Sequence, residues 1–437
     1  MNYNIKERSK NSLKINLRYV YLLVLGALYV LSSTSWKLPV IEINYSILFY
    51  AFILIIPFLI INSYSISKKF VIFYIFFILF LLIHILIPLV KLNFIPSVNP
   101  KDMPYVVEYL IKLLLGPIVI YLFSKIIKNK EDLIYFMFTS AATLVVIYVY
   151  LHYLYIFVYG EPYVGVVIDG FGMKAYKNTF ALSLVLLFPY FFYYCIQKKY
   201  SYIVRLVSLL AIITIFVAMF FINSRSMVII GIIEMLIFFY FSSSRKFKFF
   251  VIIAAICASP LLTNISSDIF YSKIYKKSFN PDVELQEIIS SYENYYILKS
   301  HRGWLLHEAV NGSMKNLFIG HGMGEFRIRD TNRGSRTDTH NDFTLILYEY
   351  GLIGFLLLVY FFYYLIKKFY NYKKLFKIHK DKDNYDLVVA SFASIIGIII
   401  SMLFTNILQS LILFWIHIAI YMSIVDKITI NNKKDSD

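Results

Sequence analysis

Repeated apolar runs, each long enough to cross a bilayer, constrain this chain more than any other feature. About twelve are predicted, at residues 19–35, 41–61, 70–90, 104–123, 133–159, 178–196, 203–222, 227–241, 247–262, 343–366, 387–405 and 408–425. The chain is 59% hydrophobic, whereas soluble domains are roughly 45–50% apolar. Because a bilayer offers no water to the backbone, runs of this length favour helices over a barrel. The sequence therefore predicts an all-α polytopic membrane protein.

Lysine and arginine residues are concentrated in every second loop between these runs. If the N-terminus is cytoplasmic, the inside connections hold most of them, including Lys68 and Lys69, Lys125 and Lys128, and the basic loop 367–382. This bias follows the positive-inside rule and predicts that both termini are cytoplasmic. The net charge of +17 is then a signal of topology, and we expect no nucleic-acid partner. No A-x-A cleavage site follows the first run, so we expect it to remain as an uncleaved span.

The runs divide the chain into three parts. Residues 1–262 hold the first nine predicted spans, residues 263–342 form a large loop on the far side of the membrane, and residues 343–437 hold the last three spans and a cytoplasmic tail. Apolar residues recur at helical spacing in 283–299 and 302–315, which predicts two amphipathic helices at the membrane surface. The last two runs are almost contiguous, so a re-entrant pair is the alternative there.

Residues 300–342 are a polar stretch with four of the eight histidines. His340 directly precedes the tenth run, and we expect Thr337, Asp338 or Thr339 to be the N-cap of the helix that follows. His340 would then lie in the first helical turn, where the positive end of the helix favours a neutral imidazole. A neutral imidazole can accept a proton from a hydroxyl. The alternative is a capping or structural histidine.

Two arginines are candidates for binding an anion. Arg225, in the sequence Asn-Ser-Arg-Ser, lies at the outer junction of the seventh and eighth runs, and Arg302 begins the second loop helix. A guanidinium group binds phosphate in a bidentate fork that lysine cannot reproduce. The alternatives are an arginine that reaches lipid headgroups and an arginine on the solvated face of a helix.

The same stretch contains a glycine turn at Gly320, Gly322 and Gly324. No strand precedes it, so we reject a dinucleotide cradle and expect close backbone approach instead. The histidines form no H-E-x-x-H motif and lie near no cysteine pair, so we expect no metal site. Cys195 and Cys257 both fall within apolar runs, which indicates no disulfide framework.

Several motifs together resemble those of the O-antigen ligase and polymerase superfamily of bacterial envelope enzymes. They are NSRS at 223–226, HRGW at 301–304, NLFIGHGMGEF at 316–326 and THNDFTLILYEYGLIG at 339–354, with a weaker GFGMKAYKNTFALS at 170–183. The resemblance covers essentially the whole chain, and its specific motifs lie in 223–354. It implies a membrane glycosyltransferase with a GT-C-like fold: about 12 transmembrane helices and a large helical periplasmic loop between the ninth and tenth.

The resemblance also implies a donor and a set of site residues. The donor is a glycan on undecaprenyl diphosphate, displayed on the periplasmic face of the bacterial inner membrane. Arg225 and Arg302 would bind the diphosphate, and His340 would be the general base at the acceptor hydroxyl. The reaction would be an inverting displacement without metal or cofactor. The candidate supporting residues are Asn341, Asp338, Trp304 and His321.

The acceptor distinguishes the members of this superfamily. A ligase transfers the finished polymer to lipid A–core, whereas a polymerase transfers the growing chain to another lipid-linked repeat unit. A third branch glycosylates protein but usually carries a further soluble part. The size of the chain, its sixth run and its loop favour a ligase, with a polymerase as the alternative.

A lipid-linked glycan flippase or other transporter is the rival from another class. Three charged residues inside apolar runs support it: Glu108 and Lys112, one helical turn apart, and Glu234. A transporter should carry its main charges at the bilayer midplane between internal repeats, and no repeat is found in the sequence. A non-catalytic envelope scaffold is a third, weaker alternative.

Overall fold

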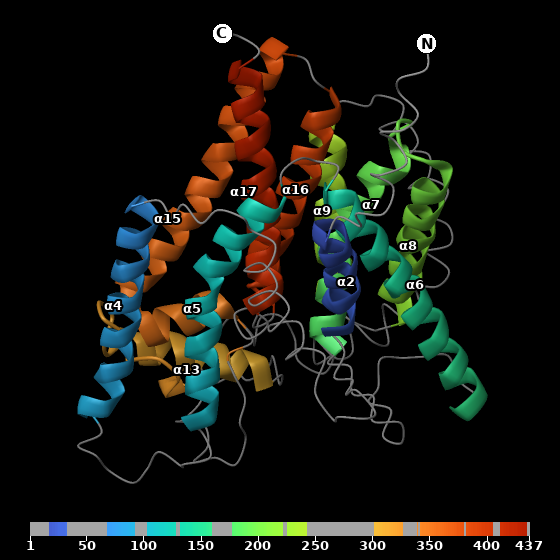
Figure 1. Ribbon diagram of the computed structural model, residues 1–437. Coiled ribbons are helices and arrows are strands. Elements are labelled where there is room, and N and C mark those ends of the chain that lie inside the picture. Colours follow the sequence, from blue (N-terminus) through green and yellow to red (C-terminus); the bar gives the residue numbers. More distant parts are fainter. Residues whose placement is uncertain are drawn as a thin grey trace, which may run out of the picture. The chain divides into compact units, whose positions relative to one another are not determined.

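The structure is a computed structural model that describes residues 17–32, 68–91, 103–127, 132–159, 177–221, 225–242, 301–326, 339, 341–379, 382–404 and 411–434. Within these ranges the regular secondary structure is helical, and no strand is present. The helices (Figure 1) are α2 (Leu17–Ser32), α4 (Lys68–Lys91), α5 (Met103–Ile126), α6 (Asp132–Tyr159), α7 (Lys177–Ile196), α8 (Tyr202–Phe221), α9 (Arg225–Phe241), α13 (His301–Met314), α15 (Asp342–His379), α16 (Lys382–Ser401) and α17 (Leu411–Lys434).

These helices follow the predicted apolar runs closely. Each run coincides with one helix, except for 41–61 and 247–262, which lie outside the described residues together with the predicted loop helix 283–299. Three helical segments are long and apolar enough to cross a membrane: Asp132–Val149, Asp342–Phe376 and Lys382–Ser401. The described parts of the other predicted spans form shorter apolar helices. The all-helical class is therefore confirmed, and the number of spans stays a prediction.

The tenth predicted span is longer than expected. It was expected to end near residue 366, but α15 continues to His379 and includes much of the predicted basic loop. Lysine is a good helix former, and Lys367 and Lys368 lie over the rings of Tyr363 and Tyr364, each one turn earlier. These contacts extend the helix beyond its apolar part. α16 alone is long and apolar enough for a full span, which favours a span over a re-entrant element there.

One compact unit comprises residues 1–65, 118–231 and 415–437. In it α2 packs along α6, and α8 packs on both α6 and α7. Gly26 permits the close approach of α2 to α6, because a Cβ there would overlap the Phe136 carbonyl, and the Ser140 hydroxyl donates to the Gly26 carbonyl at 3.0 Å. Small residues at such contacts are typical of helices that pack within a membrane.

Polar side chains fix the two ends of α2 in this unit. The guanidinium of Arg18 pairs with the buried carboxylate of Asp132 at 2.8 Å, at the start of α6. Further along α2, the hydroxyl of Tyr29 lies 2.7 Å from Nε2 of His417 on α17. Both Tyr29 and His417 are fully buried, so these contacts tie helices that are distant in sequence.

The second unit comprises residues 66–117 and 232–414. In it α9 runs antiparallel to α16: Glu234 lies against Gly397, and Ser242 donates to Asp386 at 3.2 Å. α16 also packs on α15, with the rings of Phe369 and Phe392 stacked at a centroid distance of 3.9 Å. This unit holds the loop helix α13 and the glycine turn.

Intramembrane charges were the basis for the transporter alternative. Glu108 and Lys112 lie in α5, but their side chains are outside the part that the structure describes. Glu234 is fully buried, and neither carboxyl oxygen has a hydrogen-bond partner among the described residues. Its carboxyl group occupies the space that a Cβ on Gly397 would need. Glu234 is thus part of the α9–α16 packing.

We predict that Gly397→Ala destabilises the protein, because the new methyl group overlaps the Glu234 carboxyl group. Overpacking of this kind costs about 1–3 kcal/mol, which should appear as a lower melting temperature in detergent. The shorter side chain of Glu234→Ala should restore much of the loss in the double variant. Equal melting temperatures for wild type and Gly397→Ala would contradict this packing.

Candidate functional site

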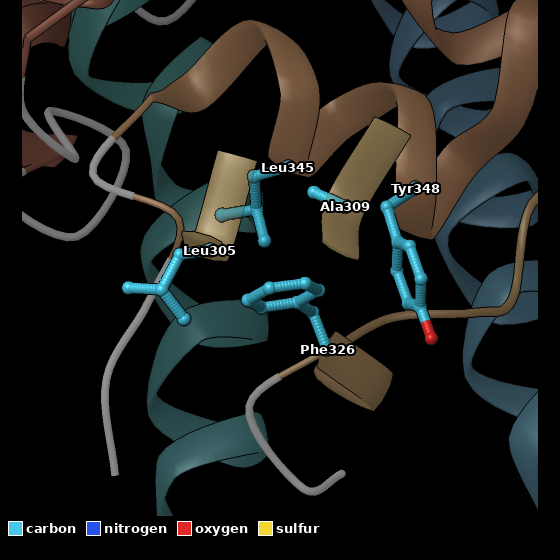
Figure 2. Packing of buried hydrophobic residues seen from close by; sticks show 5 residues of the cluster. All are labelled: Leu305, Ala309, Phe326, Leu345 and Tyr348. Carbon is cyan, nitrogen blue, oxygen red and sulfur yellow. The ribbon is translucent and has the colours of Figure 1, made fainter. Parts of the chain in front are cut away.

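The loop helix α13 packs on the first segment of α15. Figure 2 shows the cluster of buried side chains between them, formed by Leu305, Ala309, Phe326, Leu345 and Tyr348. The rings of Phe326 and Tyr348 meet edge to face at a centroid distance of 5.1 Å. At Gly312 a Cβ would overlap the Tyr348 ring, so glycine is needed for the helices to come this close. The predicted second loop helix is confirmed, and it is held in place by α15.

α15 is broken at Gly351. This residue has φ 66° and ψ −167°, a conformation that glycine adopts readily and other residues do not. The break separates a short segment, 342–350, from the long segment that begins at Leu352. A helix break leaves backbone carbonyls before it and backbone N–H groups after it without helical partners, and buried groups of this kind need other partners.

The glycine turn supplies those partners. His321 and Gly322 donate their N–H groups to the carbonyls of Tyr348 and Glu349, at 2.9 and 2.8 Å. In return, Leu352 and Ile353 donate to the carbonyls of Leu317 and Phe318, at 2.7 and 3.3 Å. These four hydrogen bonds join two backbones directly.

Gly320 and Gly351 lie at the centre of this joint. Both have positive φ, and a Cβ on either residue would overlap the backbone at the other. The sequence predicted close backbone approach at the glycine turn, and the structure confirms it. The approach is to α15 itself, which was not anticipated. We call the segments 316–324 and 348–353 together the glycine joint.

α4 also contributes to the glycine joint. The N–H of Met323 donates to the carbonyl of His84 at 2.9 Å. This carbonyl lacks the usual α-helical donor, because the residue four positions later is Pro88, which has no N–H. The His84 ring packs against the rings of Phe80 and Tyr350, at centroid distances of 4.3 and 5.0 Å, and these two rings also stack on each other at 6.0 Å. Three segments distant in sequence therefore meet here.

His321 is a structural part of the joint. Its Nε2 lies 2.8 Å from the Gly312 carbonyl, which can only accept, so Nε2 carries the proton. Its Nδ1 lies 3.2 Å from the amide nitrogen of Asn316 and acts as the acceptor. The ring stacks on Tyr348 at a centroid distance of 4.3 Å. With both nitrogens engaged, His321 supports the turn by binding it to α13 and α15.

The start of α15 is anchored to the end of α16. Asn341 is the N-cap: its Oδ1 accepts from the N–H of Thr344 at 3.1 Å. The Asn341 amide donates to the Leu403 carbonyl at 3.2 Å, and the N–H of Asp342 donates to the Met402 carbonyl at 2.8 Å. Donors at a helix N-terminus thus meet acceptors at a helix C-terminus, which satisfies both ends.

This arrangement corrects the predicted cap. Thr337, Asp338 or Thr339 was expected to cap the helix and to leave His340 in its first turn. The helix instead begins at Asp342, so His340 precedes the N-cap. The prediction was wrong because Asn341 caps the helix and also bonds to the segment at the end of α16. The local sequence gives no information about this distant partner.

The remaining predicted site residues are placed only in part. Arg225 is the first residue of α9, and Arg302 and Trp304 lie in the first turn of α13, but their side chains are not described. His340 and Asp338 lie outside the described residues. The association of the two arginines with His340 therefore stays a prediction. Among the described residues no group of three metal-binding side chains is present, and the expectation of a metal-free site also stays a prediction.

We predict that Gly351→Ala disrupts the glycine joint. The new Cβ would overlap the backbone of Phe318 and Gly320, and the residue would also have to hold a positive φ, at a cost of about 1–3 kcal/mol. Hydrogen exchange in residues 316–326 should become faster. Leu356→Ala, at a half-exposed position beyond the joint, is the control. Unchanged exchange in Gly351→Ala would contradict the proposed joint.

A comparison with known families identifies the segment that contains this site. Residues 209–359 match the family model described as O-Antigen ligase. The matched segment begins in α8 and ends in α15, so it contains α9, α13, the glycine turn and the helix break. No curated protein matches the chain. Over this segment, about a third of the chain, the sequence is similar to the O-antigen ligase family.

Proposed function

We propose that this multi-pass membrane enzyme transfers a polysaccharide from undecaprenyl diphosphate to a hydroxyl group of lipid A–core, at the periplasmic face of the inner membrane. The O-antigen ligase match over residues 209–359 carries the proposal. This match covers Arg225, Arg302 and His340, the residues assigned from the sequence motifs. The match supports an O-antigen ligase-type function in general, and the donor, the acceptor and the residue roles are the proposal.

The proposed reaction is a single displacement. The oxygen of the acceptor hydroxyl attacks the anomeric carbon of the donor as its bond to the diphosphate breaks, so the configuration inverts. His340 accepts the hydroxyl proton, and the electron pair of the broken bond leaves with undecaprenyl diphosphate. Arg225 and Arg302 stabilise the negative charge that develops on this leaving group. The reaction as proposed involves only these residues, since the lipid diphosphate is already an activated leaving group.

The surroundings of His340 support its assignment as a base. On one side Thr339 is buried, and its hydroxyl bonds to both the N–H and the carbonyl of Asn341. On the other side Asn341 caps α15 and bonds to α16. A catalytic group is most effective when rigid elements limit its movement. The proposal places the base between these two anchored neighbours in the chain.

A polymerase is the second candidate, because the superfamily contains both activities. It would use the same donor and the same residues, with another lipid-linked repeat unit as the acceptor. In a strain without the native gene, the lipopolysaccharide pattern distinguishes them. Loss of all polymer from core, with long lipid-linked chains retained, indicates a ligase. A single repeat unit on core indicates a polymerase.

We predict that His340→Ala abolishes detectable transfer and causes lipid-linked glycan to accumulate. Loss of a general base lowers the rate by about 100-fold to 10,000-fold. The glycan on lipid A–core and on undecaprenyl diphosphate should both be measured after complementation of the deletion strain. His307→Ala, on the half-exposed side of α13, is the matched control and should support normal transfer. Normal transfer by His340→Ala would contradict the assignment of His340 as the base.

We predict that Arg225→Lys and Arg302→Lys each reduce transfer by on the order of 100-fold, because lysine keeps the charge but loses the bidentate fork. The rate should be measured with purified protein and a lipid-linked donor. Arg245→Lys, at a position expected to be cytoplasmic, is the matched control. Full activity in both variants would argue against diphosphate binding by these guanidinium groups.

A further inference from the structure

The loop helix α13 presents three different faces. Successive residues are rotated by about 100° around a helix, so residues four apart share a face. One face carries Leu305, Ala309 and Ser313, which are buried against α15. The next face carries Leu306, Val310 and Met314, which are 38%, 39% and 68% exposed. The third face is polar, and its residues are His307, Glu308, Asn311 and Lys315.

The exposed apolar face continues beyond the end of α13. Phe318 and Ile319, in the turn that follows, are 68% and 53% exposed. We call Leu306, Val310, Met314, Phe318 and Ile319 the α13 stripe. Exposed apolar residues in such a row are unfavourable in water and mark a surface that contacts another apolar phase.

The α13 stripe joins the outer surface of α15. The carbonyl of Phe318 accepts a hydrogen bond from the N–H of Ile353, so the end of the stripe adjoins the start of the long segment of α15. Ile353, Leu356 and Leu357 are each at least half exposed, and they belong to a helix that is long and apolar enough to cross a membrane. The exposed apolar surface therefore continues from the membrane-spanning helix onto the loop helix.

We propose that the α13 stripe inserts into the acyl-chain region of the bilayer leaflet next to α15. Figure 1 shows α13 lying across α4 and the long segment of α15 rather than along them, as expected of a helix in the plane of the membrane. A helix with an apolar face and a charged or polar face is typical of this position, with the apolar side about 5–10 Å below the headgroups. The occupant of the stripe is bilayer lipid, because the stripe is continuous with a lipid-facing helix.

This position has a consequence for the donor site, which rests on the proposed function. Arg302 lies in the first turn of α13. A helix held at the boundary between headgroups and acyl chains keeps its first turn at the depth of lipid phosphates. The diphosphate of a polyprenyl-linked donor lies at the same depth. The α13 stripe would thus set the depth at which the guanidinium meets the donor.

Depth-dependent quenching tests the insertion directly. The full chain, with Cys195→Ser and Cys257→Ser, would carry a single environment-sensitive fluorophore at Met314→Cys or at Asn311→Cys, an exposed position on the polar face. Leu356→Cys, on the exposed side of α15, is the positive control. In vesicles of phosphatidylcholine brominated on its acyl chains, we expect quenching at positions 314 and 356 at least about twofold stronger than at position 311.

Two results would overturn the proposal. Equal, weak quenching at positions 314 and 311 would mean that the stripe faces water. A label at 314 that is shielded from aqueous iodide yet not quenched by brominated lipid would mean that protein covers the stripe. No transfer is measured, so failure of the proposed reaction leaves this result unaffected.

Discussion

The backbone hydrogen bonds of the glycine joint are the interaction on which the described part of the site depends. The break at Gly351 would leave carbonyl and N–H groups of α15 without partners, and the turn at Gly320 binds them from the opposite side. Because both glycines lack a Cβ, the two backbones can approach closely enough to bond. The joint holds α13 against Tyr348, positions the His321 ring, and binds α4 through the carbonyl that Pro88 leaves open.

A second constraint acts at the start of α15, where the end of α16 supplies acceptors for Asn341 and Asp342. The short segment of α15 is therefore held at both ends, by α16 at the N-cap and by the glycine turn at the break. In the sequence the proposed base, His340, comes just before the N-cap of this segment, and Arg302 lies in the first turn of the helix packed against it. Two attachments of this kind would help to preorganise the proposed site. The α13 stripe would add the membrane itself as a third support.

Most helices could be predicted from the sequence. An apolar run of membrane length has few other ways to form hydrogen bonds with all of its backbone N–H and carbonyl groups. The glycine turn was also predictable as a place of close approach. The helix break was not, since Gly351 lies within an apolar run and glycine occurs in ordinary transmembrane helices. The N-cap at Asn341 and the bonds of His321 depend on α16, α13 and α15, which are distant in sequence. The sequence motifs alone pointed to Arg225, Arg302 and His340, and their mutual arrangement depends on long-range packing.

The proposed reaction breaks the bond between glycan and undecaprenyl diphosphate and joins the glycan to an acceptor hydroxyl. Mass spectrometry of purified protein in vesicles, supplied with lipid-linked glycan and lipid A–core, tests this reaction directly. We predict equal amounts of released undecaprenyl diphosphate and of glycosylated acceptor, and neither product with His340→Ala. Lipid-linked glycan that reaches the other leaflet with its linkage intact, and without any glycosylated acceptor, would contradict the proposed reaction and indicate a transporter.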